Sequence, residues 1–282
     1  MTSPLHIDWD SARPKRPKSG DGPAIALLHG FAGDSSAWDW VRPGLSELGP
    51  TLAIDLMGHG QSPAPDDVKR YTMDSTLEDL AAVMRDLRLP PSWWIGYSLG
   101  GRVALNLAIR KPELVRGVIL VSASPGLQYK AERDARVEED EALAQFILAA
   151  GMEAFVERWL AMPLFAGFDQ MPEERVKLER ERRLSQRPIG LANSLRGLGT
   201  GNMPSLWDRL GEIKAPALVV TGDEDEKFSQ IGATMVSAIP GAEMARVPAS
   251  SHAPQTEQPD TFVLVVSRFI RNQESGSAAR AG

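Results

Sequence analysis

The sequence predicts an α/β fold, in which a mostly parallel central sheet carries helices on both faces. Short apolar runs alternate with segments of helical spacing along most of the chain, a pattern typical of parallel sheets. The alternation stops at Pro125 and resumes after about Gly201, and the residues between them are rich in Glu, Arg, Ala, Leu and Met. This interval predicts a helical segment inserted into one core, and 282 residues are enough to bury a core of that size.

Seven short apolar runs are predicted as strands, because each is shorter than a typical buried helix. Residues 24–28, for example, read Ala-Ile-Ala-Leu-Leu. Five of the runs precede the inserted segment, at residues 5–9, 24–28, 51–56, 93–95 and 117–122. The other two follow it, at residues 217–221 and 243–247.

Helical spacing of apolar residues predicts the segments that cover this sheet. In residues 74–89, for example, Leu77, Leu80, Met84 and Leu87 recur at that spacing, and Asp74 is predicted as the N-terminal cap. The other core helices are predicted at residues 36–48, 102–109, 228–238 and 261–271. Those of the inserted segment are predicted at residues 132–151, 153–161 and 172–184.

These elements divide the chain into a core, formed by residues 1–124 and 202–272, and a helical cap formed by residues 125–201. The basic, proline-rich residues 13–18 are predicted to form an exposed turn, because proline blocks both helices and inner strands. Residues 273–282 are mostly small, which predicts a disordered tail.

Composition narrows the classes of function. The chain contains no cysteine, which excludes disulfides and thiolate chemistry. The formal net charge of -6 argues against nucleic acid as a partner, and no apolar run approaches the ~20 residues of a membrane span. No cluster of His, Asp and Glu has metal-ligand spacing, and the first residues contain no apolar segment of signal-peptide type. We therefore expect a cytoplasmic protein that has no bound metal and does not associate with a membrane.

The segment Gly96-Tyr97-Ser98-Leu99-Gly100 lies between a predicted strand and a predicted helix. Strand, G-x-S-x-G and helix together form the context of a nucleophile elbow, a sharp turn that lifts a serine hydroxyl clear of the sheet. Glycine two residues to either side removes bulk that would clash in such a turn. The alternative is an ordinary glycine-rich turn between a strand and a helix. Other residues of the chain are needed to distinguish this turn from a nucleophile elbow.

A serine of this kind needs a histidine to take its proton and a carboxylate to orient the histidine. On such a sheet the chain order is serine, acid, histidine, each in a loop after a strand. Only His252 lies after a late strand and before the last helix. The acid is expected after residues 217–221, where the G-x-x-D spacing favours Asp225, with Asp223 as the alternative. Ser98, Asp225 and His252 are therefore predicted to form a catalytic triad.

The loop His29-Gly30-Phe31 follows an early strand and is predicted to complete the site. In this arrangement one backbone amide after the early strand and one after the serine form an oxyanion hole. The amides of Phe31 and Leu99 are therefore predicted to converge on one oxygen. His29 and His59, each beside a glycine, are predicted to be buried histidines that tie loops together.

Several pieces of the chain match the pattern of a known family. They are residues 29–34 with Trp38, residues 96–104, Pro125-Gly126-Leu127 with Glu132, Arg133 and Arg136, then Trp159, Pro163 and Phe165, and Asp225-x-Lys227-Phe228. Over almost its whole length the chain resembles the α/β-hydrolase fold family, and within that family it is similar to the menaquinone-pathway lyases, the 2-succinyl-6-hydroxy-2,4-cyclohexadiene-1-carboxylate synthases. Met57 and Ser251 depart from this pattern, which has proline and glycine there.

The resemblance implies an α/β-hydrolase fold with a helical cap inserted after the sixth strand. It also implies a small anionic substrate with three carboxylates, a cyclohexene ring and an enolpyruvyl ether, from which pyruvate is eliminated without a cofactor. Arginine suits such a substrate, because its planar guanidinium binds carboxylates with two donors and stays charged. The substrate-binding residues expected from the resemblance are Tyr97, Arg102, Arg136, Trp159 and Arg183.

Two other functions remain open from the sequence. A serine carboxylesterase or a C–C bond hydrolase of the same fold would use the same triad and oxyanion hole, so those residues do not discriminate. A non-catalytic member that binds a small molecule in the same pocket is the second alternative. No obligate protein partner is inferred for any of the three.

Overall fold

The computed structural model describes residues 4–9 and 23–281, the last five of them by their backbone only. Within these residues seven strands form one sheet in the order β1-β3-β2-β4-β5-β6-β7. Strand β1 pairs with β3 antiparallel, and every other pair is parallel. The strands are β1 Ile7–Trp9, β2 Ile25–Leu28, β3 Thr51–Ile54, β4 Ser92–Tyr97, β5 Val115–Val121, β6 Ala217–Gly222 and β7 Glu243–Val247. The predicted α/β sheet is confirmed.

Register brings the ends of the central strands to the same edge. Leu28, the last residue of β2, pairs with Gly96 of β4, and Tyr97, the last residue of β4, pairs with Val121 of β5. Strands β2, β3 and β4 are buried throughout because both faces of the sheet are covered. Consequently the loops after residues 28, 97 and 121 leave the sheet side by side.

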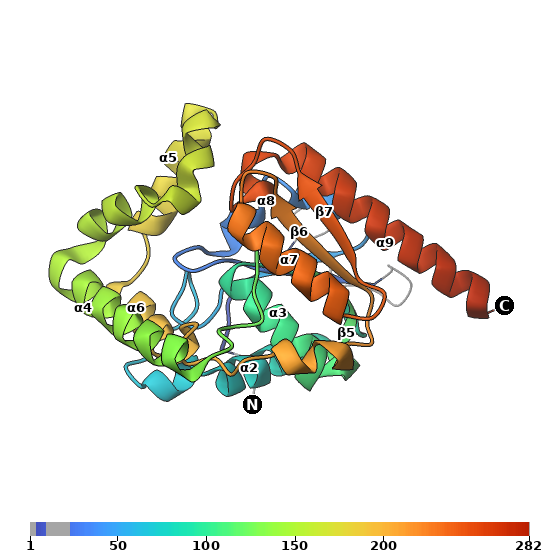
Figure 1. Cartoon of the computed structure of the whole chain (residues 1–282), viewed down its shortest axis with the longest axis horizontal. Coiled ribbons are helices and arrows are strands. Elements are labelled where there is room, and N and C mark those ends of the chain that lie inside the picture. Colours follow the sequence, from blue (N-terminus) through green and yellow to red (C-terminus); the bar gives the residue numbers. More distant parts are fainter. Residues whose placement is uncertain (1–3, 10–22, 282) are drawn as a thin grey trace.

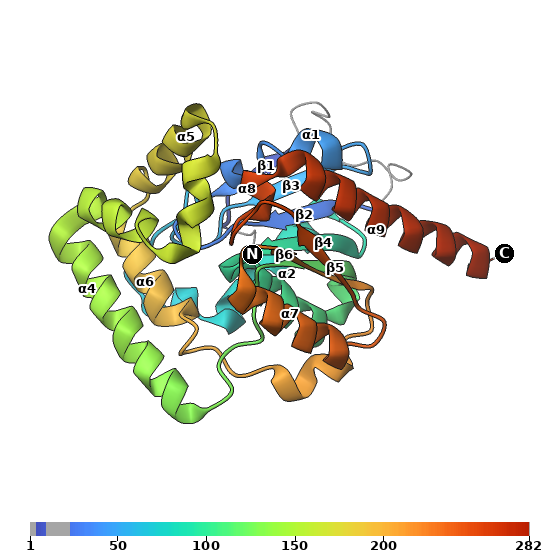
Figure 2. The ribbon, with the colours of Figure 1, turned by 45° about the horizontal axis from the view of Figure 1, so that its top comes forward.

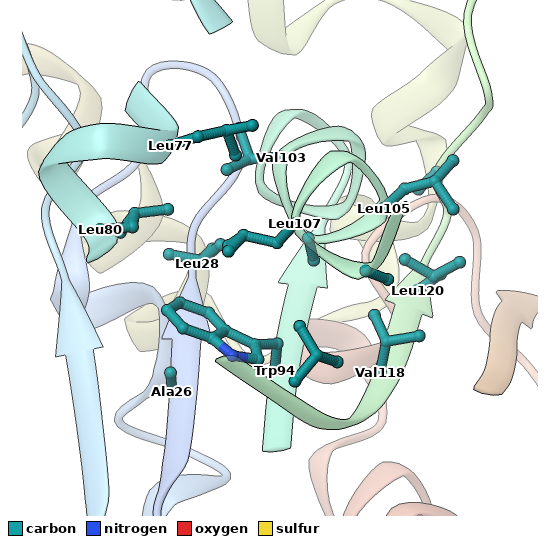
Figure 3. Packing of buried hydrophobic residues seen from close by; sticks show 14 of the residues in the cluster. Ala26, Leu28, Leu77, Leu80, Trp94, Val103, Leu105, Leu107, Val118 and Leu120 are labelled. Carbon is teal, nitrogen blue, oxygen red and sulfur yellow. The ribbon is translucent and has the colours of Figure 1, made fainter. Parts of the chain in front are cut away.

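Helices cover both faces of the sheet. The helices α2 Met73–Leu87, α3 Leu99–Arg110 and α7 Glu226–Ala238 pack on one face, while α1 Arg42–Leu45 and α9 Pro259–Ala281 pack on the other. Figure 3 shows Leu28 and Trp94 of the sheet between Leu80 of α2 and Leu107 of α3. The core is therefore built from alternate residues of each strand.

The cap stands to one side of the sheet, opposite the end of α9 (Figures 1 and 2). It consists of α4 Lys130–Leu160, the 3₁₀ segment η4 Pro163–Gln170, α5 Glu173–Leu184 and α6 Pro188–Leu198. Gly151 breaks α4, because its φ of 78° and ψ of 177° are not helical. Five described strands precede the cap, whereas the resemblance implied six.

Several predicted elements differ from the structure. Residues 36–48 form η1 Ser35–Trp38 and the single turn α1 rather than one helix. Asp74 is not the cap of α2, because the Thr72 side chain accepts from the Ser75 amide and Asp74 lies in the first turn. Helix α6 was not predicted, and neither was η4.

The two terminal predictions have different outcomes. The predicted turn at residues 13–18 lies outside the described residues. The predicted disordered tail from residue 273 is wrong through Ala281, where α9 ends. Glu274 explains the extension, because its carboxylate accepts from Trp93 Nε1 at 3.0 Å and pairs with Arg116. In the described part of the chain, no helix is long and apolar enough to cross a bilayer.

The contact between β5 and the Trp93 ring generates a stability prediction. A Cβ at Gly117 would overlap the Trp93 ring, whereas a Cβ at Gly276 of α9 would meet no atom within 4 Å. We expect Gly117→Ala to lower the free energy of unfolding by about 1–3 kcal/mol through overpacking. The matched substitution Gly276→Ala should be neutral or stabilise by up to about 1 kcal/mol. Urea unfolding of both variants checks this, and equal midpoints would contradict the packing argument.

Candidate active site

Ser98 lies on a strained turn between β4 and α3. Its φ of 49° and ψ of -106° are rare for a residue with a side chain, and its amide donates to the Val121 carbonyl at 2.9 Å. A Cβ at Gly96 would overlap the Gly100 carbonyl, and a Cβ at Gly100 would overlap the Leu28 carbonyl. The two glycines of the motif therefore allow three backbone segments to meet beneath the serine.

The structure brings Ser98, His252 and Asp225 together. The His252 Nδ1 lies 2.8 Å from Asp225 Oδ2, and its Nε2 lies 3.3 Å from Ser98 Oγ. Since a carboxylate only accepts, Nδ1 carries the hydrogen and Nε2 is free to accept from the serine hydroxyl. Asp223 instead lies exposed and accepts from the Ser250 amide at 3.4 Å. The geometry of a hydrogen-bonded triad therefore selects Asp225 over Asp223.

Glu257 holds the loop that carries His252. Its buried carboxylate accepts from the amides of Ser251 and Ala253 at 2.6 and 2.9 Å, and from the Ser251 hydroxyl at 2.8 Å. The residues on both sides of His252 are thus fixed by one side chain. The hydroxyl bond exists because serine stands where the resembled family has glycine. Sequence reasoning missed Glu257, although an acid five residues after the histidine was visible.

Phe31 and Leu99 line the same cavity as Ser98. Neither amide donates to a protein acceptor within the described residues, so both donors remain available to a ligand oxygen. Glycine at position 30 lets the loop after β2 pass close to Tyr97, because a Cβ there would lie 2.7 Å from the Tyr97 ring.

His29 is a structural histidine, as predicted. It lies fully buried, its Nε2 accepts from the Leu56 amide at 3.0 Å, and its Nδ1 donates to the Gly30 carbonyl at 2.8 Å. Burial lowers the pKa of His29 and also that of His59, whose ring lies 4.9 Å away. Both rings therefore stay neutral and tie together the loops after β2 and β3.

A cavity of about 480 Å³ lies above the Ser98 hydroxyl, between core and cap. Core residues form its floor, including Ser98, Leu99 and His252. The cap forms its walls through α4, η4, α5 and α6. The volume falls within the usual range of small-molecule sites.

Two of the expected arginines, Arg102 and Arg136, line this cavity near each other. Arg102 donates to the Leu198 carbonyl at 2.8 Å, and Arg136 Nε donates to Asp140 Oδ1 at 2.8 Å. Burial and the neighbouring Arg136 lower the pKa of Arg102 to about 10, which still leaves the guanidinium charged at neutral pH. Burial raises the pKa of Asp140, and Arg136 only partly opposes this.

Arg183 reaches the cavity from α5 as part of a buried cluster. It donates to the Glu179 carboxylate at 2.6 Å, and Arg182 bonds to the other oxygen of the same carboxylate. Burial raises the pKa of the Glu179 carboxyl, but Arg183 and Arg182 outweigh it and hold the pKa below its ordinary value. Arg182 also donates to Ser36 Oγ at 2.7 Å, so this cluster fastens α5 to the core.

Tyr97 and Trp159 also line the cavity, as expected. Burial raises the pKa of Tyr97 far above its ordinary value, so its hydroxyl stays protonated as a donor. The Trp159 ring packs 5.3 Å from Phe31, and its buried Nε1 has no partner within the described residues. The structure therefore brings every expected substrate-binding residue to one cavity.

Sequence reasoning assigned no role to several other lining residues. Arg158 and Lys227 add two cations, Glu139 and Asp140 add two acids, and Ser194 adds a buried hydroxyl. Lys227 belongs to the D-x-K-F motif that matches the resembled family, and this motif is a sequence signal that could have identified it. In the part of the chain that the structure describes, no group of three His, Asp or Glu side chains could hold a metal ion.

Comparisons with known proteins agree with this fold. The sequence profile of the α/β-hydrolase fold family matches residues 23–259. A Bacillus subtilis protein provisionally named 2-succinyl-6-hydroxy-2,4-cyclohexadiene-1-carboxylate synthase is 40% identical over 247 residues, covering 88% of this chain and 90% of that protein. The solved structure of MenH from S. aureus is 32% identical, has a TM-score of 0.89 and covers 95% of this chain and 99% of that one.

A relative with another activity is also similar. The pimeloyl-[acyl-carrier protein] methyl ester esterase of Nitrosospira multiformis is 31% identical over 265 residues, covering 89% of this chain and 96% of that protein. Proteins named for hydrolysis and proteins named for the synthase reaction thus share this architecture. The fold alone does not choose between them.

The buried cluster around Glu179 generates a pH-dependent stability prediction. We expect Glu179→Gln to lower the free energy of unfolding by about 3 kcal/mol at pH 7, because the buried Arg183 loses its counter-charge and the buried Arg182 keeps only Asp34, at 3.5 Å. The folded pKa of Glu179 lies below its ordinary value of 4.5, so this stabilisation is present above pH 4.5 and is lost as the pH falls through the folded value. The difference between the wild type and the variant should therefore shrink in acid.

Denaturant unfolding at pH 7 and in acid measures that difference. Glu181→Gln is the matched control, because Glu181 is more than half exposed and its Lys177 partner is 3.8 Å away. If Glu179→Gln lowers the free energy of unfolding by the same amount at both pH values, packing rather than charge stabilises the cluster.

Proposed function

This chain belongs to the α/β-hydrolase fold family, and from that membership we propose that it is a carbon–oxygen lyase of menaquinone biosynthesis. The proposed reaction eliminates pyruvate from 2-succinyl-5-enolpyruvyl-6-hydroxy-3-cyclohexene-1-carboxylate. The product is 2-succinyl-6-hydroxy-2,4-cyclohexadiene-1-carboxylate. Likeness to the Bacillus subtilis protein and to MenH from S. aureus supports this choice over other reactions of the family.

The observation that carries the proposal is the charge of the cavity. Five cationic side chains line it against two carboxylates, although the whole chain has a formal net charge of -6. Positive charge that is concentrated in one cavity of a negatively charged chain favours a polyanionic ligand. The proposed substrate carries three carboxylates, whereas a neutral ester would gain nothing from these cations.

In the proposed mechanism His252, oriented by Asp225, accepts the Ser98 proton, and Ser98 takes the substrate proton at C2, next to the succinyl ketone. The C–H electron pair first forms an enolate, whose oxygen is stabilised by the amides of Phe31 and Leu99. One such donor is typically worth about 3 kcal/mol.

The enolate then expels the leaving group. The electron pair of the enolate forms the C2–C3 double bond. The π electron pair of the C3–C4 double bond moves to C4–C5, and the C5–O bond breaks. The leaving enolpyruvate takes up a proton and becomes pyruvate. No acyl-enzyme and no water are needed, and the aromatic walls formed by Phe31, Trp159 and Phe165 favour exclusion of water around the enolate.

The second candidate function is ester hydrolysis. The observation that favours it is the likeness to the esterase of Nitrosospira multiformis. Hydrolysis would use the same Ser98, His252 and oxyanion donors, but would pass through a covalent acyl-enzyme that water must reach. Rapid turnover of a p-nitrophenyl ester would favour the hydrolase, and a binding protein without catalysis would turn over neither substrate.

The first functional prediction concerns the chemical step. Supplied with the enolpyruvyl intermediate, the protein should release stoichiometric pyruvate without a burst of acyl-enzyme, because elimination requires no acyl transfer. A coupled lactate dehydrogenase assay measures pyruvate, and mass spectrometry after rapid quenching measures adducts. A stoichiometric adduct on Ser98 with this substrate would refute the lyase mechanism and favour the hydrolase.

The second functional prediction concerns the triad. Ser98→Ala and His252→Ala should each lower kcat by about 10³-fold or more, because proton transfer is lost while the cavity remains. Asp225→Asn should lower kcat by at least about 100-fold. The matched control Asp223→Asn should stay within about twofold of the wild type, as expected for an exposed residue. Circular dichroism would verify folding, and the reverse ranking of the two aspartates would overturn the assignment.

A further inference from the structure

Arg158 and Lys227 differ from the other cations of the cavity. Both line it, both are exposed, and neither pairs with a carboxylate within the described residues. The Arg158 guanidinium lies 5.0 Å from the Phe146 ring centroid, and Lys227 Nζ lies 5.8 Å from that of Phe228. Their charges are therefore uncompensated on the solvent side of the cavity.

Two of the other three arginines of the cavity already pair with an acid. Arg136 is bonded to Asp140, and Arg183 is bonded to Glu179, each by a charged contact shorter than 3 Å. Arg102 has only a neutral partner, the Leu198 carbonyl. A ligand carboxylate that binds Arg136 or Arg183 has to share the guanidinium with an internal acid. Three lining cations have no such competitor, and two of them were not assigned from the sequence.

The two free cations belong to different parts of the structure. Arg158 belongs to the part of α4 beyond the break at Gly151, in the cap. Lys227 belongs to the first turn of α7, in the core, next to Phe228, whose ring lies 4.4 Å from that of His252. An anionic ligand bound to both cations would therefore contact the cap and the core at the same time.

The position of Lys227 is also unfavourable for the helix that carries it. The N-terminal turn of a helix has a partial positive charge and prefers acids, as Asp225 at the cap and Glu226 in the first turn of α7 illustrate. A lysine in this turn gains nothing from the dipole of α7. The dipole of α7 therefore does not explain its charge.

We propose that Arg158 and Lys227 form a carboxylate-binding pair, which takes one carboxylate of a polycarboxylate substrate from the cap side and the core side. The polycarboxylate nature of the ligand rests on the proposed function. The pair attracts the anion before it reaches the other arginines of the cavity, and the bound carboxylate holds the cap against the core. Arg158 and Lys227 are thus further specificity-determining residues for this cavity.

Binding of tricarballylate (propane-1,2,3-tricarboxylate) tests the pair without relying on catalysis. Isothermal titration would compare the wild type with Arg158→Gln, Lys227→Gln and the double variant at low and high salt. The matched controls are Arg268→Gln and Lys214→Gln, two exposed cations outside the cavity that form no ion pair within the described residues. The neutral trimethyl ester of the same compound is the control ligand.

Each cavity variant should bind tricarballylate about fivefold more weakly, and its affinity should fall less steeply with salt. The controls should bind it like the wild type, and binding of the ester should be independent of all four positions. With the enolpyruvyl substrate, kcat/KM should fall while kcat stays the same, because the lost contact is made before the chemical step.

Two results would overturn this proposal: unchanged tricarballylate affinity in the double variant, or equal losses in the controls. The proposed function fails separately. If pyruvate is not released but tricarballylate binding still depends on Arg158 and Lys227, the reaction is wrong and the anion-binding pair remains. If pyruvate is released and the double variant binds tricarballylate normally, only the pair is wrong.

Discussion

The close approach of three backbone segments beneath Ser98 is the constraint on which the rest of the site depends. Gly96, Gly100 and the Leu28 carbonyl meet where no Cβ fits, so the turn after β4 has one available path. That path gives Ser98 its positive φ and starts α3 at the next residue. It also leaves the Leu99 amide without an acceptor among the described residues, beside the loop that carries Phe31. Nucleophile geometry and oxyanion donors therefore follow from one steric requirement, which the parallel register of β2 and β4 maintains.

Helices and strands with a clear apolar spacing of their own could be predicted from the sequence. Helices that form because of their contacts with the rest of the fold could not. The strands and α2 carry their own apolar spacing, so all of them were found. Helix α6 was missed because Gly190, Asn193 and Gly197 are poor helix formers. In the structure, Gly190 lies against Gly58, and a Cβ at Gly197 would lie 2.7 Å from Tyr71. The glycines that weaken the helix signal are thus the ones that let α6 approach the core.

In the candidate active site, too, some features could be predicted from the sequence and others could not. Ser98, Asp225 and His252 could be named because strand order fixes which loops meet, and the arginines could be named from the resemblance. The sequence could not tell which cations are neutralised, because that depends on whether an acid three or four residues away shares the buried face. Glu179 does so for Arg183, whereas the exposed Arg158 has no such partner. Burial, which no single residue of the sequence encodes, therefore decided the electrostatics of the cavity.

Hydrolysis and elimination place the same demands on the core, since both need a proton acceptor and a pair of amides facing a developing oxyanion. The triad and the oxyanion donors can therefore be shared by esterases and lyases without change, and a difference between the two has to arise in the residues that contact the substrate. In this chain the cap supplies Arg136, Arg158 and Arg183, and the core supplies Arg102 and Lys227, to a cavity whose floor contains the serine. Burying Arg183 costs desolvation, which its ion pair with Glu179 offsets, and the hydrogen bond from Arg182 to Ser36 holds α5 on the core. A cap held this way favours a ligand whose own charges replace the lost water, and it gives no comparable advantage to a neutral ester.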